Sequence, residues 1–392
     1  MDQRFYIAQL DGLRFIAFSL VFLHHLPVAP INEDAYRVFK FLFLRLHNFG
    51  WVGVELFFCL SAFLMTSLLL LEHAQKGRCS ISSFYLRRVL RIWPLYFFAM
   101  LLGFVLFPLL SIPSSLEFGS HEYVRMVRQH LLPMVLFFGN VSAAINYYAP
   151  SPATAPLWTI SSEEQFYLIL PLVITALAGR SIKTWLWVLG GTSAFSLGVR
   201  IAFIVIEVKH PVVWVIQIAH MDSFLIGMLL ALLWLRRSIV SWMSESVAYA
   251  ALCLATLLFT AVALAPDVSA GSVHSIWQYP IVSLGFGLVL LPLCVGRPRM
   301  LVGLLSRKSV VWLGKISYGL YVYHLMAIVA VGWAIMWFDG FGFPGLAWGK
   351  WLAYLAISLA LVVGVSAISY ACLERPFLRL KAKFELVPSR AP

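Results

Sequence analysis

Ten apolar stretches constrain what this chain of 392 residues can fold into. Because lipid offers the backbone no hydrogen-bond partners, a segment crosses a membrane as an α-helix of about 20 mostly apolar residues. The stretches lie at about 10–28, 50–71, 92–112, 163–179, 184–206, 219–235, 247–265, 279–296, 313–338 and 350–373. They predict an all-α fold, a polytopic membrane helix bundle with about ten transmembrane helices.

The composition supports a membrane protein. Apolar residues make up 61% of the chain and charged residues only 12%, with a mean hydropathy of +0.88, well outside the range of soluble domains. The connections at about 27–49, 111–129 and 149–162 are too short to bury a core of their own. We therefore expect one integral-membrane domain over residues 1–380, followed by a short cytoplasmic tail at 381–392.

Residues 130–148 are apolar only in their first half and contain Pro133, Gly139 and two asparagines. If this segment does not cross the membrane, both termini lie on one side, and most of the 29 Lys and Arg residues fall on that side. By the positive-inside rule the termini are then cytoplasmic, and residues 130–148 are re-entrant or interfacial. The formal charge of +12 is explained by these loops, and we expect no nucleic-acid partner.

Known soluble-enzyme signatures are absent from the sequence. The five cysteines have no C-x-x-C spacing, so neither a disulfide framework nor a metal site is expected. There is no Walker loop and no G-x-S-x-G elbow. Any chemistry must come from polar groups on or between the helices.

The first apolar stretch carries four ionisable residues. Arg14 and His25 are eleven positions apart, nearly three helical turns, so they share one face at a separation of about 16 Å. Asp11 lies one turn before Arg14 and is expected to support it, whereas His24 points about 80° away and is expected to pack against a neighbouring carbonyl. An ionisable residue inside a membrane is expensive, which favours a functional role for His25.

The second cluster is FYLRRVLRIWPLYF, residues 84–97. Arg87, Arg88 and Arg91 gather three guanidinium groups at the start of a span, and guanidinium forks suit phosphate. A topology anchor formed with Trp93 and Tyr96 explains the same pattern, and the sequence leaves the two alternatives balanced.

The third cluster is APLWTISSEEQFYLILP, residues 155–171, on the side opposite the termini. Ser161 and Glu164 have the spacing of a capping box, which gives Glu164 a structural role. Glu163 has no such role and is a candidate to orient a histidine or bind a hydroxyl group. Trp158 is either an interfacial anchor or a sugar-stacking ring, and the anchor is favoured.

Three smaller polar groups follow. They are Asp222, which enters an apolar stretch, the helical stripe of Tyr318, Tyr321 and His324, and Glu374–Arg375–Pro376 at the end of the last stretch. A local Glu–Arg pair that ends the helix explains the last group. For Asp222, Tyr321 and His324 we expect supporting or acceptor-binding roles, because ionisable groups in spans are usually functional.

Seven of these segments occur in a fixed order from Leu10 to Pro376. They are LDGLRFIAFSLVFLHH, GVELFFCLSAFL, FYLRRVLRIWPLYF, LWTISSEEQFYLILP, MDSFLIG, ISYGLYVYH and LERP. Together they resemble the blocks of the membrane-bound acyltransferase-3 family. Ala62 and Glu55 depart from that pattern, since glycine and aspartate are usual at these positions.

The resemblance implies a multi-pass protein of the bacterial inner (cytoplasmic) membrane that transfers an acyl group, usually acetyl from acetyl-CoA, to a carbohydrate hydroxyl. It implies acetyl-CoA as a co-substrate and no permanently bound cofactor. The implied partners are acyl-CoA, a carbohydrate or lipid-linked glycan acceptor, and the lipid bilayer.

The family's site patterns coincide with residues already singled out. They are R-x10-H at Arg14 and His25, R-R-x-x-R at Arg87, Arg88 and Arg91, and a tryptophan-to-glutamate block at Trp158 and Glu163. The resemblance suggests that the arginines bind the CoA phosphates, that His25 is a general base or an acyl carrier, and that Glu163 orients His25 or the acceptor hydroxyl.

Two other function classes fit the same polar residues. A transporter or flippase for a lipid-linked glycan would use buried His and Glu as a proton relay, and a sensor or scaffold would perform no chemistry. Only the enzyme releases free CoA in the presence of an acceptor.

Overall fold

The computed structural model describes residues 5–28, 33–112, 116–236, 241–266, 268, 273–339 and 347–385. Within these ranges the chain forms helices and turns and no strand. The α-helices are α1 (Ala8–His25), α2 (Glu33–Phe49), α3 (Val52–Lys76), α4 (Ile81–Leu101), α5 (Phe107–Leu109), α6 (His121–Met126), α7 (Leu132–Val135), α8 (Gly139–Asn146), α9 (Leu157–Leu177), α10 (Ile182–Val205), α11 (Val212–Val215), α12 (Asp222–Trp234), α14 (Glu245–Leu264), α15 (Ser275–Cys294), α16 (Arg299–Leu305), α17 (Lys308–Lys315), α18 (Ser317–Asp339), α19 (Ala347–Ser369) and α20 (Arg375–Ala382).

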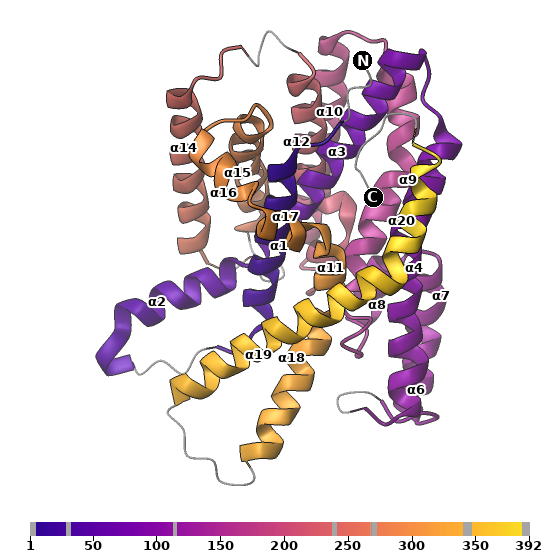
Figure 1. The fold of residues 1–392 in the computed structure, drawn as a ribbon, viewed down its shortest axis with the longest axis vertical. Coiled ribbons are helices and arrows are strands. Elements are labelled where there is room, and N and C mark those ends of the chain that lie inside the picture. Colours follow the sequence, from indigo (N-terminus) through magenta and orange to yellow (C-terminus); the bar gives the residue numbers. More distant parts are fainter. Residues whose placement is uncertain are drawn as a thin grey trace.

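Each of the ten apolar stretches lies on a helix, which confirms the all-α membrane fold (Figure 1). In the described part of the chain, eight helices are long and apolar enough to cross a membrane. α1 has the required length, 18 residues, but its four ionisable residues lower its hydropathy. α12 has only 13 residues, or about 20 Å, and is shorter than the hydrocarbon core.

The shorter helices sit against long neighbours at very close range. α12 packs along α3, and a Cβ atom at Gly227 of α12 would collide with the carbonyl oxygen of Cys59 on α3. α17 approaches α1 in the same way, since a Cβ atom at Gly314 would meet the backbone of Asp11. Small residues at these points let the helix backbones touch, as is common between helices in membranes.

Two connecting segments differ in character. Residues 130–148 form the end of a π-helical turn (Val127–Leu131) and the short helices α7 and α8, so they contain no helix that could cross a membrane, as predicted. Residues 27–49, expected to be a polar connection, instead include the helix α2. Figure 1 shows α2 extending away from the bundle, toward the lower left of the view.

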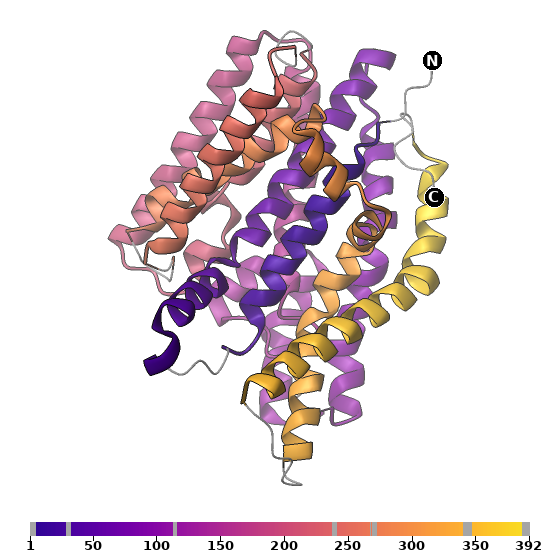
Figure 2. The same cartoon turned by 60° about the vertical axis from the view of Figure 1, so that its left-hand side comes forward.

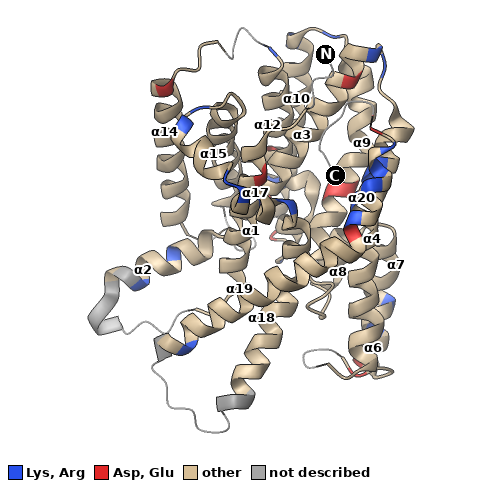
Figure 3. Ribbon diagram, viewed as in Figure 1, with Lys and Arg blue, Asp and Glu red and all other residues tan. Residues whose placement is uncertain are grey.

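The two ends of the described chain meet at one cavity, which is lined by Phe5, Tyr6 and Ile7 from the start and by Lys381 and Glu385 from the end. Lys and Arg residues, coloured blue in Figure 3, lie along the neighbouring helices α4 and α20. The predicted tail begins inside α20, and its residues 386–392 lie outside the described residues.

Candidate active site

Three adjoining cavities run through the bundle in a row. We call them the terminal cavity, where the chain ends meet, the central cavity, and the histidine cavity, which contains His25. The terminal and central cavities share four lining residues, Arg14, Met65, Arg88 and Arg91. The central and histidine cavities share Val54 and Tyr321.

The first half of α1 supplies charge to the terminal cavity. Arg14 donates a hydrogen bond to Asp11 at 3.0 Å, and the hydroxyl of Tyr6 donates to the other carboxylate oxygen at 3.0 Å. The Asp11 side chain is almost wholly buried, whereas Arg14 keeps 16% of its side-chain surface exposed. Asp11 therefore holds Arg14 at the point where the terminal and central cavities join.

The arginine cluster on α4 divides into two parts. Arg87 is buried and donates to Glu72 at 2.6 Å and to the carbonyl of Phe384 at 3.0 Å. Arg88 and Arg91 line both the terminal and central cavities and form no ion pair within the described ranges. The structure thus commits Arg87 to a buried ion pair and leaves Arg88 and Arg91 facing the cavities.

Arg88 is positioned by aromatic rings. Its guanidinium lies 5.9 Å from the ring centroid of Phe84 and 5.7 Å from that of Tyr167, and its Nε atom has no hydrogen-bond partner. Aromatic faces hold a guanidinium without consuming its donors. Arg88 therefore keeps donors for an anion.

Glu163 lines the central cavity together with Arg14, Arg88 and Arg91. Its carboxylate accepts a hydrogen bond from Ser61 of α3 at 2.6 Å. α9 begins at Leu157, so Glu163 lies inside the helix and not at its start as expected. Its cavity is the one next to that of His25, and Ser61 and Arg14 line the same cavity as Glu163.

The predicted capping box is wrong, because α9 begins before it. Ser161 and Glu164 are both inside the helix, where Ser161 accepts a hydrogen bond from the backbone of Gly139 at 3.2 Å. Glu164 accepts one from the indole of Trp93 at 3.3 Å. Both side chains thus connect α9 to neighbouring segments.

His25 is the last residue of α1 and is exposed to the histidine cavity, which has a volume of about 430 Å³. Its Nδ1 lies 2.8 Å from the carbonyl of Val21. A carbonyl only accepts, so Nδ1 carries the proton of the neutral ring and Nε2 keeps a free lone pair. His24 bonds through Nδ1 to the carbonyl of His47 at 2.9 Å, a packing contact of the predicted kind.

α18 contacts His25 through the ring of His324. The ring of His324 is buried and lies 4.9 Å from that of His25, edge to face, while its Nδ1 bonds to the carbonyl of Tyr321. The hydroxyl of Tyr321 is 2.9 Å from that of Thr159. Because Tyr321 lines both the central and histidine cavities, as Val54 does, it forms part of the partition between them.

Aromatic side chains form much of the remaining wall of the histidine cavity. Trp158 is 7% exposed and lies 6.0 Å from Trp214, and Trp51 and Tyr148 complete this group. A buried tryptophan inside the bundle does not fit the interfacial anchor that the sequence favoured. It fits a wall on which a flat apolar face can stack.

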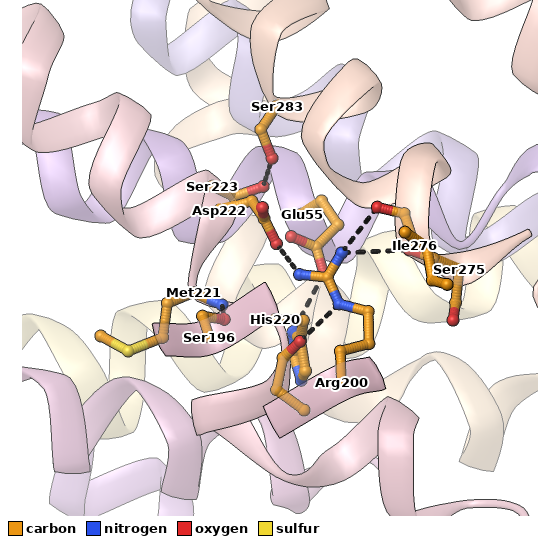
Figure 4. Close-up of polar contacts among 11 residues, drawn as sticks. Glu55, Ser196, Arg200, His220, Met221, Asp222, Ser223, Ser275, Ile276 and Ser283 are labelled. Carbon is orange, nitrogen blue, oxygen red and sulfur yellow. Dashed lines mark hydrogen bonds and ion pairs between the residues drawn. The ribbon is translucent and has the colours of Figure 1, made fainter. Parts of the chain in front are cut away.

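Asp222 lies outside the three cavities, in a buried ion pair with Arg200 of α10 (Figure 4). Arg200 also donates to the carbonyls of Ala219 at 2.7 Å and Ser275 at 3.0 Å, and it lies over the ring of Tyr279. The pair joins α10, α12 and α15. Of the two expected roles of Asp222, supporting or acceptor-binding, the buried pair fits the supporting one.

A second buried pair adjoins it. His220 lies 3.3 Å from Glu55 of α3 (Figure 4), and its ring stacks on that of Tyr279. Neither Arg200 nor His220 is among the polar groups predicted from the sequence. The signal was present for Arg200, as a lone charge within the stretch 184–206 that requires a partner.

The prediction that a local Glu374–Arg375 pair ends the last helix is also wrong. Glu374 lies in a π-helical turn, Tyr370–Glu374, from which the chain continues directly into α20. Its side chain is buried, and Oε1 has no hydrogen-bond partner. The last span therefore does not end at Pro376.

The row of cavities begins with the cationic residues of the terminal cavity, continues with Glu163 in the central cavity and ends with His25 in the histidine cavity. The arginines suit phosphate groups, and the lone pair of His25 Nε2 suits the removal of a proton from a hydroxyl. Among the described residues there is no group of three or more His, Cys, Asp or Glu that could hold a metal ion.

Comparison with known proteins identifies a family. The family model described as "Acyltransferase domain" (acyltransferase-3) matches residues 7–370. A Staphylococcus aureus (strain COL) protein named for O-acetyltransferase activity is 25% identical over 382 residues, covering 95% of this chain and 57% of its own length. O-acetyltransferase OatA of S. aureus (strain NCTC 8325 / PS 47) is 26% identical over 341 residues, covering 83% and 51%.

The chain thus spans a little more than half the length of these curated relatives. No solved structure matches it. The family match covers nearly the whole chain, from the start of α1 to the end of α19. The chain therefore belongs to the acyltransferase-3 family.

Proposed function

We propose that this enzyme transfers an acetyl group from acetyl-CoA to a hydroxyl of a carbohydrate acceptor. The observation that carries the proposal is the row of cavities, with unpaired guanidinium groups at one end and His25 at the other. Each relative named above is an O-acetyltransferase by name, which supports the acetyl group and the hydroxyl acceptor.

The donor would enter from the terminal cavity. Arg88 and Arg91, with Arg14 beside them, suit the diphosphate of CoA, and the pantetheine arm would then extend through the central cavity. The eleven residues from Arg14 to His25 separate them by about 16 Å along α1. An extended pantetheine arm covers that distance.

The acceptor would occupy the histidine cavity. Sugar rings have apolar faces that stack on aromatic side chains, and Trp158 and Trp214 offer such faces. Many membrane-made glycans are carried on lipids, so a lipid-linked glycan in the inner membrane of a bacterium is the acceptor class that we propose.

The reaction needs one proton acceptor. His25 Nε2 takes the proton of the acceptor hydroxyl while the hydroxyl oxygen attacks the thioester carbonyl, and a tetrahedral intermediate forms. Collapse of this intermediate breaks the C–S bond, and the CoA thiolate takes the proton from His25. Tyr321 lies between the two cavities, and its hydroxyl accepts from Thr159 and donates only a long hydrogen bond of 3.4 Å to the carbonyl of Pro156. It is therefore the candidate donor to the oxyanion.

Glu163 would act in the central cavity. Its negative charge balances part of the charge of Arg14, Arg88 and Arg91, and its hydrogen bond with Ser61 fixes α9 against α3. It therefore positions the arginines around the donor. An alternative chemistry, in which His25 itself carries the acetyl group, uses the same Nε2 lone pair.

Release of free thiol from acetyl-CoA by the purified protein tests the proposal. With acceptor we expect release to rise well above the rate without it, and in His25→Ala to fall to that background. His121→Ala, which changes an exposed histidine on α6, is the matched control and should keep the wild-type rate. Transport of a lipid-linked glycan without consumption of acetyl-CoA would establish the flippase alternative.

A further inference from the structure

The end of the described chain forms one wall of the terminal cavity. α20 packs beside α4 (Figures 1 and 2), and Lys381 and Glu385 line the cavity together with Arg88. The segment is held in place by Arg87, which donates to the carbonyl of Phe384 at 3.0 Å. The C-terminal segment is therefore built into the donor entrance.

The terminal cavity carries an excess of positive charge. Its cationic lining residues are Arg14, Arg87, Arg88, Arg91 and Lys381, and its anionic ones are Asp11 and Glu385. Asp11 pairs with Arg14, Glu72 pairs with Arg87 from outside the cavity, and Glu385 pairs with Lys381. Because charges shielded from water require a counterion, this cavity suits a ligand with several phosphate groups.

Lys381 differs from the other cations in where it lies. Arg88 and Arg91 line both the terminal and central cavities, whereas Lys381 lines only the terminal cavity. Its side chain is 12% exposed and its amine is 3.1 Å from Glu385. A largely buried ammonium group is thus held near the outer part of the entrance.

The order of the groups along the CoA molecule matches the positions of the two arginines and of Lys381. If the pantetheine arm enters the central cavity, the diphosphate attached to it lies at the junction with Arg88 and Arg91. The adenosine and its 3′-phosphate then lie farther out, on the side of Lys381.

We propose that Lys381 binds the 3′-phosphate of the donor and that the C-terminal segment is thereby part of the donor site. This inference rests on the proposed function. Glu385 holds the ammonium group when no nucleotide is bound, and the phosphate replaces this carboxylate. The enzyme is then able to tell coenzyme A from its 3′-dephospho form.

The test compares acetyl-CoA with acetyl-3′-dephospho-CoA as donors for the purified full chain. Loss of a contact between charged groups lowers affinity by about tenfold. We therefore expect Lys381→Gln to raise KM about tenfold for acetyl-CoA and to leave KM for the dephospho donor unchanged. Lys381→Arg should keep most of the discrimination, which shows that the segment still folds.

Two further variants provide controls. Arg379→Gln removes an exposed charge from the same helix and should change neither KM. Arg88→Gln should raise KM for both donors, because the diphosphate is common to them. An equal rise in both KM values in Lys381→Gln, or no rise in either, would overturn the inference.

Binding measurements separate this inference from the proposed function. Calorimetry with CoA and 3′-dephospho-CoA reports the role of Lys381 even if no acceptor supports turnover. Equal affinity of wild-type protein for the two ligands refutes the inference alone. Absence of any acetyl-CoA turnover with every acceptor refutes the proposed function instead.

Discussion

Removal of the Arg200 guanidinium should destabilise the bundle strongly. Arg200 is fully buried and donates to Asp222 and to the carbonyls of Ala219, Ser275 and Ile276. Breaking a buried pair by removing one partner costs about 3–5 kcal/mol, because the other charge is left without compensation. Each orphaned carbonyl adds to that cost.

We therefore expect Arg200→Met to lower the free energy of unfolding by about 4 kcal/mol or more. Asp222→Asn keeps an oxygen for the guanidinium and should cost less, about 2 kcal/mol. The double variant Arg200→Met/Asp222→Leu removes both charges and should recover part of the loss, so the single effects will not add.

Thermal unfolding of the detergent-purified variants, followed by intrinsic fluorescence, measures these differences. Initial rates per folded molecule, taken well below every melting temperature, should stay within about twofold of wild type in Asp222→Asn. The reasoning is refuted if Asp222→Asn melts like the wild type but has lost its acetyl transfer, since Asp222 would then act on the reaction.

Four other substitutions test the assignment of roles. Arg87→Gln should lower the melting temperature by several degrees, because it breaks a buried ion pair. Arg88→Gln should mainly raise KM for acetyl-CoA. The reverse pattern would exchange the roles of the two arginines. Tyr321→Phe should lower kcat about tenfold with little change in either KM, and an unchanged kcat excludes its hydroxyl from the reaction. Gly314→Ala should reduce the yield of folded protein, because its Cβ atom has no room against α1, and normal yield and melting would show that α17 can shift.

Hydropathy predicted the long apolar helices, because the membrane makes apolar length the dominant signal, but it did not predict α2. It misplaced the start of α9, since Thr159, Ser161 and Ser162 look like a polar loop. In the structure these side chains bond to backbone carbonyls three or four residues back and are buried in the bundle. Local hydrogen bonds of this kind make hydroxyl residues compatible with a buried helix.

The separation of Arg14 and His25 was predictable from the sequence because both residues lie on one helix. The partners of the other ionisable residues were not predictable, since they lie on other helices. Arg87 pairs with Glu72 and Asp222 with Arg200, and which charges meet depends on how the helices pack. The cavity that each arginine faces depends on the same packing.

The most direct test of the proposed chemistry is the rate of CoA release from acetyl-CoA in wild-type and His25→Ala protein, with and without a lipid-linked glycan acceptor. Mass spectrometry of the acceptor from the same reaction detects the added acetyl group. We expect acceptor-dependent release and one acetylated product in the wild type, and neither in His25→Ala of normal melting temperature. Full acetylation by that variant would contradict the role of His25.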